Sequence, residues 1–375
     1  MNEADNINRI SVQRGLRIII AGGGTGGHIF PAIAIANAIK KQNPAVEILF
    51  VGAKGKMEME KVPQAGYNIK GLDIAGFDRS SLLKNLSLPF KLIKSFSQVK
   101  KIVSAFKPDV AIGVGGYSSF PVLRYAQKIG LPTFINESNS FAGKSNMLLG
   151  KKATKIFVAG EGMEKFFPSE KIMITGNPVR RSIVESTVTK QEALSFFNLE
   201  NDKKTILAVG GSLGARSINE IMARHVIELV SLNLQLIWQT GKATAVQYIE
   251  RGTPSKNVWV GDFIKDMDKA YAAADVVISR AGAMSVAELC VAAKPVVFVP
   301  YPLAAEDHQT ANAKYLVDRE AALMVKDNEV SARLFGTITM LATDEELQEK
   351  LKTNISKHAV TNADGIIAKT ILALL

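Results

Sequence analysis

The chain has 375 residues, of which 47% are hydrophobic and 22% are charged, and its formal net charge is +11. This length exceeds one comfortable hydrophobic core, so two domains are expected, and the composition excludes a disordered or fibrous protein. The single cysteine, Cys290, excludes an internal disulfide framework and fits a reducing compartment. Residues 1–14 carry no apolar signal core, and no apolar run is long enough to predict a membrane-spanning helix.

Apolar, β-branched runs alternate with segments of helical spacing along the whole chain. In the first half, strands are expected at residues 17–21, 47–51, 110–114, 133–135, 155–158 and 171–175. In the second half, they are expected at residues 205–209, 234–239, 258–260, 276–279 and 296–299. The alternation predicts two doubly wound α/β domains with parallel sheets, divided between Pro178 and Lys204.

Three glycine-rich loops each follow an expected strand and precede an expected helix. They occupy residues 22–31, 113–121 and 210–216. Backbone N–H groups and the helix dipole at such a turn favour negative charge, and glycine lets the backbone approach an oxygen-rich ligand. The repetition predicts a protein that handles more than one phosphate-bearing molecule.

The net positive charge lies in the first half. Residues 1–180 have a formal net charge of +13, whereas residues 181–375 have a formal net charge of −2. Residues 79–107 contain seven basic side chains and no acidic one. Leucine and phenylalanine among the bases favour an anionic membrane surface over nucleic acid, the alternative being a solvated helix face. The expected membrane contacts are Leu82, Leu83, Lys84, Leu86, Leu88, Phe90 and Lys91.

Three other patterns suggest chemistry that their surroundings disfavour. Residues 22–27 fit a dinucleotide fingerprint, but the second expected strand ends without the acidic residue that would bind a ribose. A Gly-Lys-Ser sequence at 143–145 lacks the earlier glycine of a phosphate-binding NTPase loop, because Ser138 stands there. Asp266 and Asp268 resemble a metal motif of other sugar transferases, but acids are common in the first turn of a helix, so no metal ligand is predicted.

A further strand-to-helix turn lies at residues 279–288 in the second half. Its first-turn N–H groups suit a diphosphate. Ser285 and Glu288 fall on adjacent turns of one helix face, where the carboxylate could accept two ribose hydroxyls. The alternative is a capping box made by the same two residues.

Seven motifs together resemble the MurG family, the bacterial UDP-N-acetylglucosamine transferases that complete lipid II. They lie at residues 23–31, 113–121, 136–143, 176–180, 210–216, 279–283 and 307–313. The resemblance runs from about Arg17 to the C-terminus and implies a GT-B fold, two α/β domains facing a cleft. It also implies that residues 1–179, completed by a helix at 356–375, take the lipid acceptor and dock on the membrane. Residues 180–355 would bind UDP-GlcNAc.

The resemblance implies an inverting transfer of GlcNAc to the 4-hydroxyl of MurNAc in undecaprenyl-pyrophosphoryl-MurNAc-pentapeptide. It implies no cofactor or divalent metal, a peripheral place on the cytoplasmic face of the inner membrane, and contact with anionic phospholipid and cell-wall synthesis proteins. Two alternatives stay open. One is another GT-B enzyme, a lipid glycosyltransferase or a sugar-nucleotide epimerase, the latter needing no membrane patch. The other is a non-catalytic protein that binds nucleotide sugars at the membrane.

The resemblance also assigns site residues. The donor positions are Thr25, Gly26, Gly27, Asn139, Arg180, Ser212, Ile264, Ala283, Met284, Ser285, Val286, Ala287, Glu288 and Gln309. Among them, Ile264 would meet the uracil through its backbone, Glu288 the ribose, and Gln309 and Asn139 the sugar. The acceptor diphosphate positions are Gly24, Gly115, Gly116 and Tyr117.

The base that takes the acceptor proton has two candidates, His28 and Glu137. His28 stands at a helix start, which favours the neutral imidazole that a base requires. The alternative role for His28 is to orient the acceptor's pyrophosphate.

Overall fold

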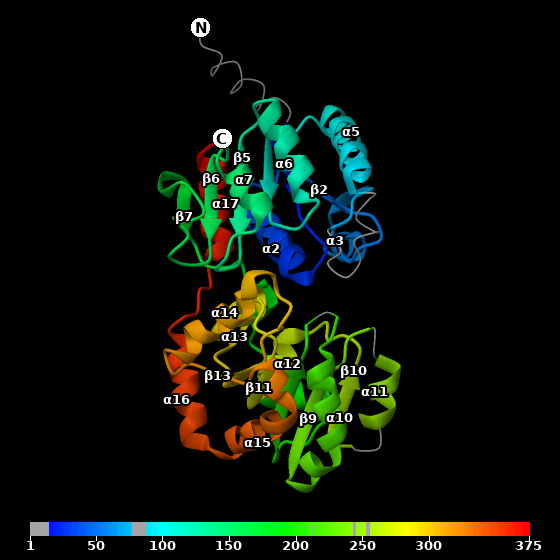
Figure 1. Ribbon diagram of the computed structural model, residues 1–375, viewed down its shortest axis with the longest axis vertical. Helices are drawn as coiled ribbons and strands as arrows, with labels where there is room; N and C mark the ends of the chain where they lie inside the picture. The colour runs from blue at the N-terminus through cyan, green and yellow to red at the C-terminus, as the bar shows by residue number, and fades with distance from the viewer. Residues whose placement is uncertain (1–14, 77–87, 212, 243–244, 253–255) are drawn as a thin grey trace. The chain divides into compact units, whose positions relative to one another are not determined.

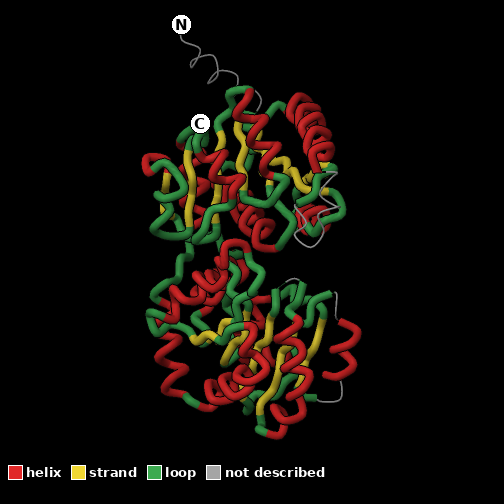
Figure 2. The backbone as a smooth tube through the Cα atoms, viewed as in Figure 1, coloured by secondary structure: helices red, strands yellow, loops and turns green. Residues whose placement is uncertain are grey.

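The computed structural model describes residues 15–76, 88–211, 213–242, 245–252 and 256–375, and these form two compact units. The first unit comprises the described part of residues 1–178 together with Asn362–Leu375, and the second is Val179–Thr361. In each unit, helices cover both faces of a parallel sheet (Figures 1 and 2). The predicted fold class is confirmed.

The first sheet has the strand order β3-β2-β1-β4-β5-β6-β7, and every pair is parallel. Its strands are β1 (Arg17–Ala21), β2 (Glu47–Ala53), β3 (Asn68–Leu72), β4 (Val110–Gly113), β5 (Thr133–Glu137), β6 (Lys155–Val158) and β7 (Ile172–Ile174). The sequence prediction missed β3, because this partly exposed edge strand includes a lysine and a glycine instead of an apolar run.

Alternate residues of β1 explain the two helical layers of the first unit. Its helices are α2 (Gly26–Gln42), α3 (Glu58–Gln64), α5 (Leu88–Phe106), α6 (Ser119–Lys128), α7 (Lys144–Gly150), η1 (Ser169–Lys171) and α17 (Ala363–Ala373). Ile18 and Ile20 belong to the core shared with α2 and α17, whereas Ile19 belongs to the core shared with α5 and α6. Helix α17, at the C-terminal end, lies beside α2, and the Gln42 side chain donates to the Gly365 carbonyl (Figure 1).

The second sheet has the order β10-β9-β8-β11-β12-β13 and is also fully parallel. Its strands are β8 (Lys204–Val209), β9 (Leu234–Gln239), β10 (Val258–Gly261), β11 (Val276–Ser279), β12 (Val296–Phe298) and β13 (Leu323–Met324). Its helices are α8 (Arg181–Val184), α9 (Lys190–Phe196), α10 (Arg216–Ser231), α11 (Ala245–Gly252), α12 (Met267–Ala273), α13 (Ala283–Ala292), η2 (Ala305–Asp307), α14 (His308–Val317), η3 (Asp327–Glu329), α15 (Val330–Thr343) and α16 (Glu345–Ser356). The two-residue strand β13 is too short to leave a pattern in the sequence.

Both sheets reverse their strand order next to their first strand, between β1 and β4 in one unit and between β8 and β11 in the other. In open parallel sheets, ligands bind beyond the carboxyl ends of the strands at this reversal. The three glycine-rich loops follow β1, β4 and β8, so all three lie at such positions.

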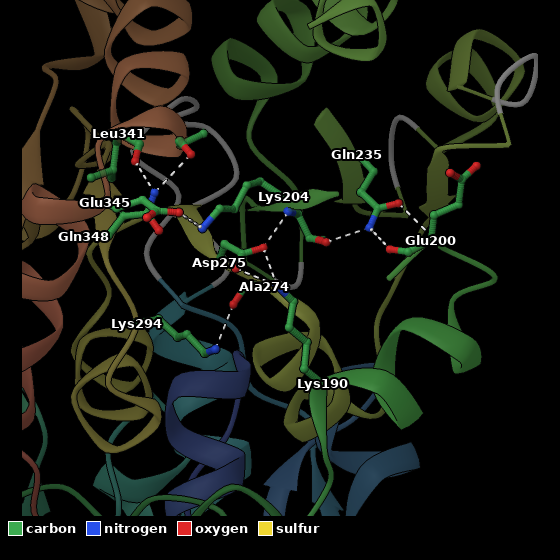
Figure 3. A network of polar contacts seen from close by, with 12 residues as sticks. Lys190, Glu200, Lys204, Gln235, Ala274, Asp275, Lys294, Leu341, Glu345 and Gln348 are labelled. Atoms are coloured by element: carbon green, nitrogen blue, oxygen red, sulfur yellow. Dashed lines mark hydrogen bonds and ion pairs between the residues drawn. The ribbon is translucent and has the colours of Figure 1, made fainter. Parts of the chain in front are cut away.

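The strands of the second sheet begin on the opposite side, which we call the amino edge, and end at the carboxyl edge. The amino edge carries a network of paired polar groups (Figure 3). The Lys190 ammonium contacts both Asp275 carboxylate oxygens at 2.6 and 2.8 Å, and Asp275 also accepts the backbone N–H of Thr205. Lys204 pairs with Glu345 at 3.0 Å, and Lys294 donates to the Ala274 carbonyl at 2.7 Å. These groups satisfy one another and brace the starts of the strands.

Candidate functional site

The two glycine-rich loops of the first unit interlock. Gly116 has a φ of +81°, and a Cβ atom there would collide with the Gly23 carbonyl oxygen, so only glycine allows this approach. The Ser119 hydroxyl lies 2.7 Å from the carbonyl oxygens of both Ala21 and Gly115, which links the end of β1 to the second loop. The predicted anion loops therefore form one continuous backbone surface.

His28 sits on this surface in the first turn of α2. Its Nδ1 atom lies 3.0 Å from the Gly23 carbonyl oxygen. A carbonyl can only accept, so we assign the proton to Nδ1 and a lone pair to Nε2. Gly115 permits the close approach of the ring, because a Cβ there would lie 2.8 Å from Nε2. The imidazole thus presents its basic nitrogen beside the second loop.

The predicted phosphate ligands Gly24 and Tyr117 lie next to each other, since the Tyr117 ring packs against Gly24, but Gly24 differs from expectation. The Gly24 N–H donates to the buried Glu58 carboxylate at 2.9 Å, so this amide is engaged by the protein itself. Donors toward a ligand come instead from Gly26 and Gly27, whose N–H groups have no partner within the helix. Burial, together with Glu58, raises the pKa of Tyr117, which keeps its phenol neutral.

Glu137, the rival base, ends β5 and is almost fully engaged by hydrogen-bond donors. Its Oε1 accepts from the backbone and side-chain nitrogens of Asn139 at 3.0 and 3.2 Å. Its Oε2 accepts from the Gly143 N–H at 3.1 Å and the Asn146 amide at 2.8 Å. A proton acceptor needs an available lone pair, so this geometry disfavours Glu137 as the base and gives it the task of shaping the loop that carries Asn139.

In the second unit, Arg180 and Glu288 form a bidentate pair. The guanidinium Nε and Nη2 atoms donate to the two carboxylate oxygens at 2.8 and 2.9 Å, and both side chains are largely buried. The Tyr271 hydroxyl, from α12, donates to the same carboxylate at 3.2 Å. Burial alone would lower the pKa of the Arg180 guanidinium, but the Glu288 carboxylate outweighs burial and the pKa is raised. Three donor atoms thus hold the Glu288 carboxylate in a fixed place.

Helix α13 begins as predicted, but without the capping box. Its N-cap is Gly282, and no side chain caps it, so the alternative role of Ser285 and Glu288 is wrong. Met284 is buried, and Val286 and Ala287 are partly buried against the core, so the polar atoms that these three residues offer a ligand are those of the backbone. The N–H groups of the first turn have no partner within the helix and can meet an anion.

A buried glutamine that the sequence reading missed connects two predicted donor segments. Gln239, at the end of β9, donates to the Gly211 carbonyl and accepts the Ile264 N–H, both at 2.9 Å. The N–H of Ile264 is thus engaged by Gln239, and its carbonyl is the backbone group that remains for a nucleobase. Gln239 carries no motif, because only the fold brings it between these loops. Ser212 lies outside the described residues.

Gln309 braces a neighbouring loop, its side-chain oxygen accepting the Tyr301 N–H at 3.0 Å. Asp266 occupies the N-cap position of α12 without a side-chain capping hydrogen bond, and its carboxylate lies 3.4 Å from the Lys269 ammonium. Within the described residues, no group of three or more His, Cys, Asp or Glu side chains could hold a metal ion.

The predicted membrane contacts fall in and before α5. Leu82, Leu83, Lys84 and Leu86 lie outside the described residues. On α5, Leu88 is partly exposed, Phe90 is 77% exposed, Lys91 is exposed, and Ile93 is 70% exposed. Among the helices described, none is long and apolar enough to span a bilayer.

Comparisons with known proteins agree with this architecture. The profile of the glycosyltransferase family 28 N-terminal domain matches residues 18–158, and that of the family 28 C-terminal domain matches residues 205–366. A relative from Bacteroides thetaiotaomicron is 52% identical over 367 residues, covering 97% of this chain and 99% of its own. A relative from Phocaeicola vulgatus is 51% identical, covering 97% of each chain. Both are named UDP-N-acetylglucosamine–N-acetylmuramyl-(pentapeptide) pyrophosphoryl-undecaprenol N-acetylglucosamine transferase.

The crystal structure of MurG from Acinetobacter baumannii superposes with a TM-score of 0.71 at 29% identity, covering 96% of this chain and 99% of that one. The strand orders, the glycine-rich loops and these near full-length matches agree. The chain therefore belongs to the MurG family within glycosyltransferase family 28.

Proposed function

We propose that this chain transfers N-acetylglucosamine from UDP-GlcNAc to the 4-hydroxyl of the MurNAc unit of lipid I, forming lipid II. The observation that carries the proposal is the placement of His28, whose basic nitrogen adjoins two interlocked anion loops. A lipid-linked pyrophosphate needs such loops, and a sugar hydroxyl that attacks needs such a base.

The donor is bound by the second unit. The first-turn N–H groups of α13 face the diphosphate and stabilise the charge that grows as UDP leaves. Glu288, held in place by Arg180 and Tyr271, accepts the ribose hydroxyls with the lone pairs that these partners leave. The Ile264 carbonyl accepts a hydrogen bond from the uracil, since the N–H of Ile264 already donates to Gln239.

The acceptor is bound by the first unit, with its pyrophosphate at Gly115 and Gly116, as expected. Gly26 and Gly27 also contact this pyrophosphate, so this proposal moves these two residues from the donor set to the acceptor set. His28 Nε2 takes the proton from the 4-hydroxyl as its oxygen attacks the anomeric carbon. The bond from that carbon to the diphosphate oxygen breaks, UDP departs with the electron pair, and the configuration inverts. Glu137 keeps the Asn139 loop in the shape that meets the sugar.

The first unit docks on the inner leaflet of the plasma membrane through α5. Phe90 and Ile93 expose large apolar side chains beside Lys91 and Lys94, a combination that suits an anionic lipid surface. Changing Phe90 and Ile93 to Ser and Lys91 to Glu should weaken co-sedimentation with phosphatidylglycerol vesicles. Ile227→Ser is the matched control, because Ile227 is 84% exposed in the other unit. Equal binding by both variants would contradict this docking surface.

One assay tests the reaction. The purified chain is incubated with radiolabelled UDP-GlcNAc and a short-chain lipid I analogue, and the products are separated for lipid-linked disaccharide. Formation of the β-1,4-linked disaccharide with release of UDP is expected. Epimerised sugar nucleotide, or UDP-GlcNAc bound and left unchanged, would contradict the proposed transfer.

A further inference from the structure

Glu58 is a buried acid that no motif in the sequence singles out. It is the first residue of α3 and only 1% of its surface is exposed. Its Oε1 accepts the Ala53 N–H at the end of β2, and its Oε2 accepts the Gly24 N–H in the first glycine-rich loop, both at 2.9 Å. A Cβ atom on Gly23 would collide with this carboxylate, so the loop is shaped around it. Among the described residues, the hydrogen-bond donors to this carboxylate are the backbone amides of Ala53 and Gly24 rather than cationic side chains.

The Gly24 N–H and the Gly23 carbonyl belong to one peptide group. Glu58 accepts from the nitrogen side of this peptide, and His28 donates Nδ1–H to its oxygen side at 3.0 Å. A carboxylate, a peptide and an imidazole are therefore joined in series by two hydrogen bonds. A peptide that donates to a negative charge becomes a stronger acceptor at its oxygen, because hydrogen bonds in a chain polarise one another.

We propose that Glu58 is a positioning residue for His28, acting through the Gly23–Gly24 peptide to fix the Nδ1–H tautomer and to strengthen Nε2 as a base. This inference rests on the proposed role of His28 as the base. The arrangement serves the purpose that a carboxylate bound directly to histidine serves in hydrolase triads, with one peptide interposed. The carboxylate stabilises the imidazolium that forms when the acceptor hydroxyl gives up its proton.

The test is a double-mutant cycle with Glu58→Gln and His28→Asn, measured on the full chain. Asparagine at position 28 can still donate to the Gly23 carbonyl but offers no basic nitrogen. Glu58→Gln should lower kcat about 10- to 100-fold, the size of a lost hydrogen bond to a charged group, with the KM for UDP-GlcNAc unchanged. In the His28→Asn background, the same change should alter the residual rate far less.

The pH profile of kcat supplies a readout that loop damage alone would not move. Without the carboxylate, the imidazolium is less stabilised, so the acid limb should shift to lower pH in Glu58→Gln. Tyr117, a titratable group beside this cluster, has a raised pKa and stays neutral across the range. Asp109→Asn is the matched control, because Asp109 accepts the Arg17 N–H at the amino edge of the same sheet and should leave the profile unchanged.

Equal losses in both backgrounds, or an unmoved acid limb, would overturn the proposal and leave Glu58 a structural residue. Nitrogen NMR of the histidine-labelled wild type keeps the proposal testable if Glu58→Gln does not fold. His28, identified by its absence in His28→Asn, should carry its proton on Nδ1, and a proton on Nε2 would overturn the relay. This measurement needs no substrate, so its failure is distinct from a failure to form product, which would contradict the proposed function.

Discussion

The two edges of the second sheet both carry charged side chains, but they use them differently. At the amino edge, Lys190, Asp275, Lys204 and Glu345 pair with one another and with strand backbone (Figure 3). At the carboxyl edge, α13 begins at Gly282 without a side-chain cap, and Glu288 of this helix pairs with Arg180 at the N-cap of α8. The charges of the amino edge pair with one another and contribute to stability. The carboxyl edge instead has the first-turn N–H groups of α13, which can bind an anion.

This comparison predicts that substitutions at the two edges have separable effects. Changes at a carboxyl edge should alter turnover or ligand binding more than stability. Changes at the amino edge should alter stability and leave catalysis intact.

The largest effect is expected for His28→Asn in the first unit. Loss of a general base typically costs ~10²–10⁴-fold in rate, and the retained donor to the Gly23 carbonyl should keep the loop folded. We expect kcat to fall by that factor while the melting temperature changes little. His225→Asn is the control, because His225 pairs with Glu228 on α10, outside the proposed site. A kcat within threefold of the parent would remove His28 from the base role.

The next effect is expected for Glu288→Ala at the carboxyl edge of the second sheet. It removes the proposed ribose acceptor, so UDP affinity measured by calorimetry should fall about 10- to 100-fold. Stability should fall as well, by ~3–5 kcal/mol, because Arg180 would be left buried without its counterion.

Glu288→Gln separates these two effects, since it keeps a polar side chain that can still accept from Tyr271 and from a ribose. Its UDP affinity should lie between those of the parent and Glu288→Ala. Glu185→Ala is the control, because Glu185 is an exposed partner of Arg181. UDP affinity unchanged in Glu288→Ala would rule out the ribose contact.

The sequence predicted the regular parts of this molecule, because they follow from local patterns. Strand-to-glycine turns and apolar periodicity located both sheets and the three glycine-rich loops at their carboxyl edges. The short or half-exposed strands β3 and β13 were missed, since a strand at a sheet edge needs no apolar run.

Long-range polar partners could not be predicted from one sequence. Glu58 and Gly24 are 34 residues apart, Gln239 and Gly211 are 28 apart, and Arg180 and Glu288 are 108 apart. In each pair, at least one residue lies outside the seven motifs, and only the three-dimensional fold brings it to its hydrogen-bond partner. Glu137 was predicted as a candidate base for the same reason, because the sequence does not show that Asn139 and Asn146 donate to its two oxygens.

The amino edge supplies the third prediction, which concerns stability and pH. Burial lowers the pKa of Lys294 from 10.5 to about 8, against the opposing effect of Asp275. Between those two values the unfolded chain binds more protons at this site, so the contribution of Lys294 to stability rises with pH and is most unfavourable below pH 8. The full difference is on the order of 3 kcal/mol.

Lys294→Met should therefore raise the free energy of unfolding, relative to the parent, more at pH 7 than at pH 10. Urea unfolding of both proteins at the two pH values measures this, and titration of all other groups cancels in the difference. Catalysis at pH 7 should be unaffected, because the residue lies at the amino edge. A stability difference that is the same at both pH values would contradict the shifted pKa.

The smallest effect is expected for removal of divalent metal. At the carboxyl edge, helix N–H groups, not a cation, are proposed to neutralise the departing UDP. Asp266, the residue most reminiscent of a metal ligand, stands at the N-cap position of α12 and lies 3.4 Å from the Lys269 ammonium. Turnover in excess EDTA should therefore remain within about twofold of the untreated rate, and Asp266→Asn should behave in the same way. Complete loss of activity in EDTA, with recovery on adding Mg²⁺ or Mn²⁺ to the parent but not to Asp266→Asn, would show that this edge depends on a metal after all.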